Sequence, residues 1–340
     1  MKRVALVLSS GGARGFAHIG AIEELQERGY EIASVAGTSM GALIGGMFAA
    51  GKLEQVKERA FALDRKRMFA LADISMGPDH LVKGEKVMGI LREIMPDIPI
   101  ETLPVPFCAV ATDLADNSEV VYDSGSLYEA IRASISIPAF FKPQRNGEML
   151  LIDGGVLNPL PLNRVTRSDG DLLVSVNVSA HSDMRLEHLR ETRKRNRTSA
   201  GRLPALGRLP DENFYSVLSK TFVMMLQRNA ELTAQLYPPD IRVDIPMNRF
   251  GGFDYDKAAR ISSEGRRRMR EACRDYDACV MTGPTEIPHF TGLPSMALRL
   301  CMTENGQPRG VILYGADEAC LISAALTIES FCDPVVYPEW

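Results

Sequence analysis

The sequence lacks the patterns that mark a metal site or a membrane span. Its six cysteines include no CxxC pair and no histidine at zinc-site spacing, so we expect reduced thiols and no metal. No segment approaches the roughly 20 consecutive apolar residues that a transmembrane helix needs. The apolar run at residues 4–8 is also too short for a signal peptide. We therefore expect a cytoplasmic protein.

The charge balance gives little reason to expect nucleic acid as a partner. Lys and Arg number 39 against 43 Asp and Glu, for a formal net charge of −4. The glycine-rich turn "SSGGARG" at residues 9–15 has neither the GxxxxGK[ST] nor the GxGxxG order, which argues against a nucleotide phosphate loop. The chain has 340 residues, 45% of them hydrophobic, enough for one large domain or one domain with an appendage.

The N-terminal segments alternate strand and helix, as in a parallel sheet covered by helices. "RVALVLS" predicts a strand, "FAHIGAIEELQERG" a helix and "EIASVAG" a second strand. The pattern therefore predicts an α/β fold with a mostly parallel central sheet that continues to about residue 245. Further strands are expected at residues 106–112, 119–123, 148–153, 171–178 and 241–245.

Two long helices are predicted after most of the sheet. Apolar residues recur at helical spacing between Asn213 and Leu236, which is typical of a long amphipathic helix. The segment "DKAARISSEGRRRMREACRDYD" predicts a second long helix, and we expect its arginines to face solvent.

Two further segments differ in composition from the predicted core. Residues 185–208 carry eight Lys and Arg against two Glu, which predicts a mobile basic insertion; contact with anionic lipid is the alternative. The tail predicts a hairpin about "ENGQ" followed by a helix. We expect one domain over residues 1–282 and a small C-terminal extension over residues 283–340.

The segment "GTSMG" at residues 37–41 is a candidate nucleophile site. It matches the GxSxG elbow, in which a serine at a sharp turn between strand and helix exposes its hydroxyl. A predicted strand precedes Ser39, and small residues follow it, as close packing of a helix on the sheet requires. The alternative is a glycine-rich helix start with Ser39 as the N-cap.

The residue that would act as the base for Ser39 distinguishes a Ser-Asp dyad from a Ser-His-Asp triad. None of the five histidines has a clear triad context; they are His18, His80, His181, His188 and His289. Asp153 instead ends a predicted strand and enters the glycine turn "DGGVLNPLP", at the sheet edge where sites of open α/β folds gather. A Ser-His-Asp triad stays open as an alternative.

With these motifs in order, the chain resembles the patatin-like phospholipase family over roughly residues 3–280. "GGARG" is similar to the family's oxyanion loop, "GTSMG" to its elbow and "DGG" to the second part of its Ser-Asp dyad. "ATDL" and "IRASISIPAFFKP" resemble further family blocks. Ser10 is a departure, because many members have a glycine or an acid there. In the tail beyond about residue 283 we recognise no segment that resembles the family.

The resemblance implies a three-layer α/β/α fold and a lipid acyl hydrolase of phospholipase A or lysophospholipase type, without metal or cofactor. It implies Ser39 as nucleophile and Asp153 as base. Arg14 is expected to steady the loop or to contact an anionic head group. The expected oxyanion donors are the N–H groups of Gly11, Gly12, Ala13 and Met40.

The expected partner is a lipid or another ester, and the candidate wall of an acyl cleft lies in "SISIPAFFKP". Its apolar members are Ile135, Ile137, Phe140 and Phe141. Contact with a membrane surface stays open. A short-chain carboxylesterase or thioesterase with the same dyad and a non-catalytic regulatory protein with the same fold are the alternatives.

Overall fold

A computed structural model describes residues 2–63, 84–138, 140–182, 214–282, 295–302 and 308–314. The chain divides into two units, Met1–Arg270 and Glu271–Trp340. Within the described ranges, no helix has both the length and the apolar character needed to cross a membrane. In those ranges, too, no cluster of three or more His, Cys, Asp or Glu is placed to hold a metal ion. The basic insertion predicted at residues 185–208 lies outside them.

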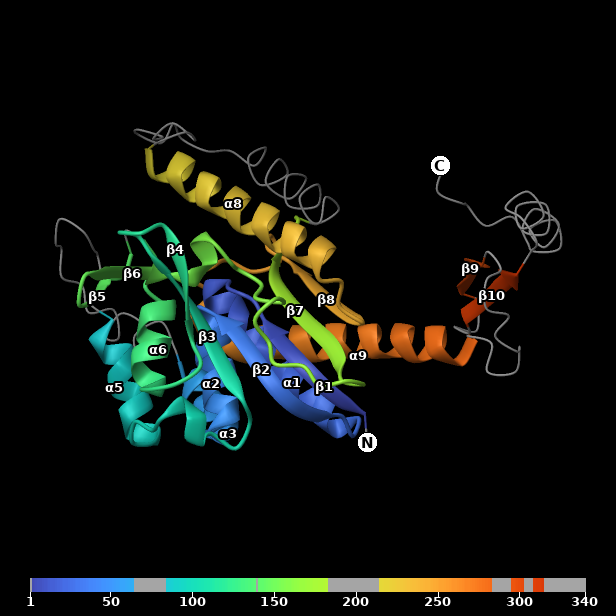
Figure 1. The fold of residues 1–340 in the computed structure, drawn as a ribbon, viewed down its shortest axis with the longest axis horizontal. Coiled ribbons are helices and arrows are strands. Elements are labelled where there is room, and N and C mark those ends of the chain that lie inside the picture. Colours follow the sequence, from blue (N-terminus) through green and yellow to red (C-terminus); the bar gives the residue numbers. More distant parts are fainter. Residues whose placement is uncertain are drawn as a thin grey trace, which may run out of the picture. The chain divides into compact units, whose positions relative to one another are not determined.

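An eight-stranded sheet forms the centre of the first unit, and its middle strands are parallel (Figure 1). The pairs β1/β2, β1/β7, β2/β3 and β7/β8 are parallel, whereas β4, β5 and β6 join in antiparallel fashion. The predicted α/β fold with a mostly parallel sheet is confirmed. The strands are β1 (Arg3–Leu8), β2 (Glu31–Thr38), β3 (Phe107–Asp113), β4 (Ser118–Tyr122), β5 (Gln144–Asn146), β6 (Met149–Asp153), β7 (Leu172–Ala180) and β8 (Ile241–Pro246).

Helices cover both faces of this sheet. The α-helices of the first unit begin with α1 (Ala17–Glu27), α2 (Met40–Ala49), α3 (Leu53–Phe61), α5 (Glu85–Ile94) and α6 (Leu127–Ser134), and end with α8 (Phe214–Leu236) and α9 (Ala258–Thr282), whose last residues belong to the second unit. Short 3-10 helices are η1 (Gly12–Phe16), η2 (Ile100–Thr102), η3 (Gly154–Val156) and η4 (Tyr255–Lys257).

The two faces of the sheet follow from the alternation of side chains along β1. Ala5 and Val7 join a buried cluster that includes Ala230 and Ala234 of α8. Leu8 points to the opposite face, where its side chain lies beside Gly45 of α2. The sheet is therefore the middle of three layers, with α8 on one side and α2 on the other.

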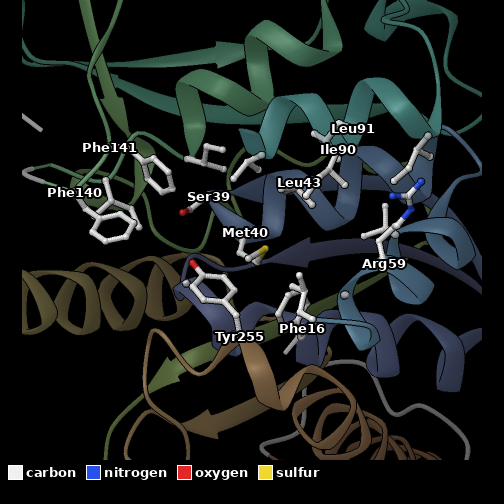
Figure 2. A pocket seen from close by; sticks show the side chains of 18 residues that line it. Phe16, Ser39, Met40, Leu43, Arg59, Ile90, Leu91, Phe140, Phe141 and Tyr255 are labelled. Carbon is white, nitrogen blue, oxygen red and sulfur yellow. The ribbon is translucent and has the colours of Figure 1, made fainter. Parts of the chain in front are cut away.

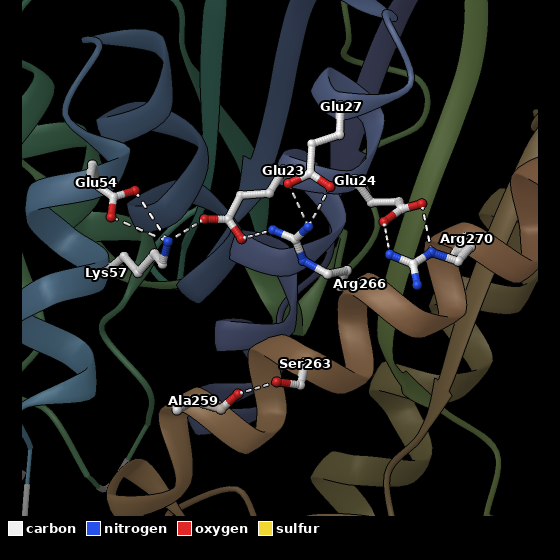
Figure 3. A network of polar contacts seen from close by, with 9 residues as sticks. All are labelled: Glu23, Glu24, Glu27, Glu54, Lys57, Ala259, Ser263, Arg266 and Arg270. Atoms are coloured by element: carbon white, nitrogen blue, oxygen red, sulfur yellow. Dashed lines mark hydrogen bonds and ion pairs between the residues drawn. The ribbon is translucent and has the colours of Figure 1, made fainter.

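Two arginines of α9 pair with α1, although Arg270 is exposed to solvent, as expected, and Arg266 is half-buried. Arg266 pairs with Glu23 at 2.6 Å and with Glu27 at 2.5 Å, and Arg270 pairs with Glu24 at 2.8 Å (Figure 3). The pairing arises because α1 presents three glutamates to α9, and the arginines reach them while staying in contact with water. Ion pairs thus fix α9 to the helix that follows the glycine-rich turn.

The second unit contains the antiparallel pair β9 (Ser295–Met302) and β10 (Pro308–Tyr314). These strands flank residues 303–307, where the sequence predicts the turn of a hairpin. The helix predicted after this turn lies outside the described residues. The predicted domain boundary at residues 282 and 283 stays a prediction.

Candidate active site

Ser39 occupies a strained turn between β2 and α2. Its φ of 57° and ψ of −120° lie in a region that residues with a side chain rarely adopt. The turn is tight, because a Cβ on Gly41 would lie 2.1 Å from the carbonyl oxygen of Leu8. The Ser39 side chain makes no capping hydrogen bond to α2. These two features fit a nucleophile elbow better than a capping role for the Ser39 side chain.

The strained turn is held by Ser134 at the end of α6, a residue that the sequence analysis missed. The Ser39 N–H donates to Ser134 Oγ at 2.8 Å, and the Ser134 hydroxyl donates to Val110 O at 2.6 Å. Ser134 is fully buried, so both bonds are shielded from water. The only sequence signal for it was its place inside the "IRASISIPAFFKP" block.

Strand pairing brings Asp153 to Ser39. Residues 107–110 of β3 pair with β2, and residues 111–113 pair with β6. The other edge of β3 is occupied by β4 over residues 109–113. The strands β2 and β6 therefore lie one after the other along the same edge of β3, and the end of β2 meets the end of β6. Asp153 therefore arrives on an antiparallel strand, a direction that the sequence did not reveal.

The Asp153 carboxyl is buried and bonded to Ser39. Ser39 Oγ donates to Asp153 Oδ2 at 2.5 Å, and the Gly155 N–H donates to Oδ1 at 2.7 Å. Burial raises the pKa of Asp153 to about 7, although the bonds from Ser39 and Gly155 oppose this rise. The carboxylate is consequently a stronger base than an exposed aspartate, whose pKa is about 3.9.

The glycine-rich turn lies beside Ser39, but its amides are not equivalent. Gly12 and Met40 line the same cleft as Ser39, and Met40 is the first residue of α2, where N–H groups lack helical partners. Gly11 is buried against Val178. The Ala13 N–H donates to Gly252 O at 2.8 Å, so it is already engaged and does not face the cleft as an unpaired donor.

Arg14 anchors the glycine-rich turn to the end of β7. Its Nε donates to Val178 O at 2.9 Å and its Nη2 to Ser179 Oγ at 3.3 Å. Burial lowers the pKa of Arg14 to about 10, against the raising effect of Tyr255. Because the guanidinium is buried and bonded to the protein, the geometry favours the loop-steadying role over contact with a head group.

The histidines that the structure describes do not join the Ser39–Asp153 pair. His18 is fully buried with Nε2 2.9 Å from Ser9 O, and burial lowers its pKa to about 4. His181 lines a separate cavity, whose described lining includes neither Ser39 nor Asp153. The remaining histidines, His80, His188 and His289, lie outside those ranges.

An apolar cleft with a volume of about 190 Å³ opens beside Ser39 (Figure 2). It includes the four apolar residues that the sequence suggested for a cleft wall, 135, 137, 140 and 141. It also includes side chains from α3 and α5 that sequence reasoning missed, because nothing in the sequence shows that these helices border Ser39. The additional lining residues are Phe16, Leu43, Val56, Arg59, Ala60, Leu63, Val87, Ile90, Leu91, Ile94 and Tyr255.

Comparison with known proteins finds a family model and several relatives that resemble this chain. Residues 6–165 match the family model described as patatin-like phospholipase, a range that contains the glycine-rich turn, Ser39 and Asp153. An uncharacterized NTE family protein of Mycobacterium tuberculosis is 44% identical over 177 residues, 52% of this chain and 49% of that protein. Neuropathy target esterase sws of Drosophila melanogaster is 28% identical over 187 residues, 53% of this chain and 13% of that protein.

The chain thus spans about half the length of the first of these relatives and a small part of the second. Among solved structures, VipD from Legionella pneumophila has a TM-score of 0.41 and 16% identity. That match covers 81% of this chain and 67% of the VipD chain.

Proposed function

We propose that this chain, whose residues 6–165 belong to the patatin-like phospholipase family, is a serine hydrolase of lipid acyl esters. The observation that carries the proposal is the hydroxyl of Ser39, held on a strained elbow 2.5 Å from a buried carboxylate. A strained backbone at a buried polar pair is a feature of functional sites. A protein that uses this fold only for binding would not need it.

Acylation uses Asp153 as the general base. Asp153 Oδ2 accepts the Ser39 proton while Oγ attacks the carbonyl carbon of the ester. A pKa of about 7 suits this task, because a general base works best when its pKa lies near the operating pH. The Gly155 N–H holds Oδ1, which leaves Oδ2 directed at Ser39.

The negative charge on the carbonyl oxygen is stabilised by backbone amides. We assign this role to the N–H groups of Gly12 and Met40, which border the cleft, with Gly11 as a further donor. Each oxyanion donor contributes roughly 3 to 4 kcal/mol in acyl transfer. Ala13 contributes only if its bond to Gly252 opens.

Asp153 acts first as an acid, to complete acylation, and then again as a base, to begin deacylation. When the tetrahedral intermediate collapses, Asp153 returns its proton to the departing alcohol, and the acyl group stays on Ser39 Oγ. Asp153 then takes a proton from a water molecule that attacks the acyl carbonyl, and the carboxylic acid leaves as Ser39 regains its proton.

The substrate class follows from the cleft. Its lining is apolar apart from Ser39, Arg59 and the hydroxyl of Tyr255, which suits a hydrocarbon chain better than a polar acyl group. We therefore assign a phospholipid or lysophospholipid as substrate. Peripheral contact with a membrane surface is part of the proposal, supported by Phe253, which is 59% exposed and lies 4.9 Å from the cleft residue Phe140 between ring centroids.

The experiment is hydrolysis of p-nitrophenyl butyrate, octanoate and palmitate, beside phosphatidylcholine and its lyso form. The full chain is compared with Ser39→Ala and with Ser124→Ala, a matched control on an exposed turn. We expect turnover of the longer esters and lipids by the wild type and the control, and none by Ser39→Ala. Turnover of butyrate alone would support a short-chain esterase instead. Wild-type turnover by Ser39→Ala would refute the proposal.

A further inference from the structure

We propose that the ion pair between Arg59 and Glu93 forms the far wall of the cleft and limits the length of the acyl chain that the site accepts. This inference rests on the proposed function, because it takes the cleft to hold the acyl chain of the ester that Ser39 attacks.

Ser39 and Arg59 are separated along the cleft by apolar side chains. Figure 2 shows Arg59 at one end and Phe140 and Phe141 at the other. Ser39 lies beside these phenylalanines, and Leu43, Ile90 and Leu91 lie between Ser39 and Arg59. Arg59 is the one charged side chain among the described residues that line this cleft. A linear chain with its carbonyl at Ser39 therefore runs over apolar side chains and ends at Arg59.

The walls between these ends follow from helical spacing. Val87, Ile90, Leu91 and Ile94 of α5 all line the cleft, and their spacing places them on one face of the helix. At a rise of 1.5 Å per residue, this face extends for roughly 10 Å along the helix axis. Val56 and Ala60 of α3 also line the cleft, one turn apart, so the chain lies between α3 and α5.

The ion pair joins these two helices. Arg59 Nη1 of α3 lies 2.8 Å from Glu93 Oε2 of α5, and the two side chains are 55% and 60% exposed. The cleft thus ends where hydrated charges begin. An alkyl group pressed against this pair displaces water from the charges and gains no hydrogen bond in return.

The wall has a measurable consequence for chain length. Each methylene that the substrate buries in the cleft should raise kcat/KM about fourfold. This factor follows from the free energy gained when one methylene leaves water, which is a little over half of that for a tenfold change in an equilibrium constant. Methylenes beyond the ion pair stay in water and contribute nothing. The rise of kcat/KM with chain length should therefore stop at a definite length.

The test measures kcat/KM for p-nitrophenyl esters in two-carbon steps from butyrate to palmitate. We compare the full-length wild type with Arg59→Leu, which replaces the charge with an apolar side chain, and with Arg59→Lys, which keeps a cation beside Glu93. The control is Arg92→Leu, because Arg92 is an exposed residue of α5 that lies 3.9 Å from Glu85 and does not line the cleft.

We expect the rise to stop at the same length in the wild type, Arg59→Lys and Arg92→Leu. In Arg59→Leu it should continue for at least one more two-carbon step, with a gain of about fifteenfold in kcat/KM for that step. An unchanged stopping length in Arg59→Leu would overturn the inference. So would an equal shift in Arg92→Leu, since that would mean a general loosening of α5.

A binding measurement separates this inference from the proposed function. A fluorescent fatty acid is titrated into each of the same proteins. Saturated fatty acids of increasing length are then tested for their ability to displace it. A stopping length that shifts only in Arg59→Leu supports the far wall even if no ester is hydrolysed, in which case only the proposed function fails. Displacement with the same length dependence in all four proteins would overturn the far wall.

Discussion

Two polar pairs each place one residue, Ser39 or Arg59, in the lining of the cleft, and the pairs differ mainly in burial. Ser39 and Asp153 are 3% and 2% exposed and lie 2.5 Å apart, whereas Arg59 and Glu93 have side chains 55% and 60% exposed and lie 2.8 Å apart. The short distance is common to both. Burial is what raises the pKa of Asp153 to about 7, while water and salt screen the exposed pair. We propose the buried pair for chemistry and the exposed pair for selection of acyl-chain length.

The largest expected effect is the loss of the buried base. Asp153→Asn keeps the size of the side chain but cannot accept the Ser39 proton, so kcat should fall by roughly 10²- to 10⁴-fold. Steady-state hydrolysis of p-nitrophenyl octanoate measures this fall. Asp123→Asn, on a turn with an exposed side chain, is the control and should keep the wild-type rate. A variant Asp153→Asn with more than a tenth of the wild-type kcat would contradict the role of base.

The same substitution should stabilise the folded chain at high pH. The pKa of Asp153 rises from 3.8 to about 7 on folding, so its contribution to stability is complete below pH 3.8 and is lost as the pH rises through about 7. Asparagine has no proton to lose. The gain in the free energy of unfolding should reach up to about 4 kcal/mol above pH 7.

Urea unfolding of wild type and Asp153→Asn at pH 5 and pH 8 measures this gain. The difference between the two proteins should be larger at pH 8 than at pH 5. The control Asp123→Asn should show no such dependence. A difference that does not change with pH would mean that Asp153 is not held protonated by burial.

The rate should follow the ionisation of the same carboxyl. Only the carboxylate can accept the Ser39 proton, and the pKa of Asp153 is about 7. Below that pH, kcat/KM should rise about tenfold per pH unit, and above it the profile should flatten. A flat profile between pH 5 and pH 8 would point to a different base.

A smaller effect is expected at the contact between α1 and α9. Arg270→Ala removes one of the two arginines that bond the buried Glu24, and a weakened partner for a buried charge lowers the free energy of unfolding. Arg274→Ala, an exposed residue of α9, should change the free energy of unfolding by less than about 0.5 kcal/mol. Equal values for the two variants would show that the network contributes no specific stability.

The smallest effect is expected at the exposed pair. Glu93→Gln removes its negative charge, and exposed ion pairs contribute only about 0 to 1 kcal/mol to stability. Urea unfolding should therefore give a difference below about 1 kcal/mol, which decreases further in high salt. A loss above 2 kcal/mol would show that the pair supports the fold and does not merely border the cleft.

The sequence predicted those parts of the site that depend on local geometry. The glycine spacing around Ser39 predicts a tight turn, and the structure has that turn with a positive φ at Ser39. The segment from Ile135 to Phe141 predicted a cleft wall, and four of its apolar side chains line the cleft. These features follow from neighbours along the chain.

The features that depend on distant partners were not predictable from one sequence. The engagement of Ala13 by Gly252, the pairing of α9 arginines with α1 and the approach of Glu93 to Arg59 all join segments far apart in the chain. The antiparallel direction of β6 is likewise set by pairing rather than by composition.

The most direct test of the central claim is covalent labelling by a fluorophosphonate, located by peptide mass spectrometry. In this reaction Ser39 Oγ bonds to phosphorus, fluoride leaves, and Asp153 accepts the proton. The account predicts one adduct, on Ser39, absent in Ser39→Ala and formed much more slowly in Asp153→Asn. An adduct on another residue of the folded chain, or an equal labelling rate in Asp153→Asn, would contradict it.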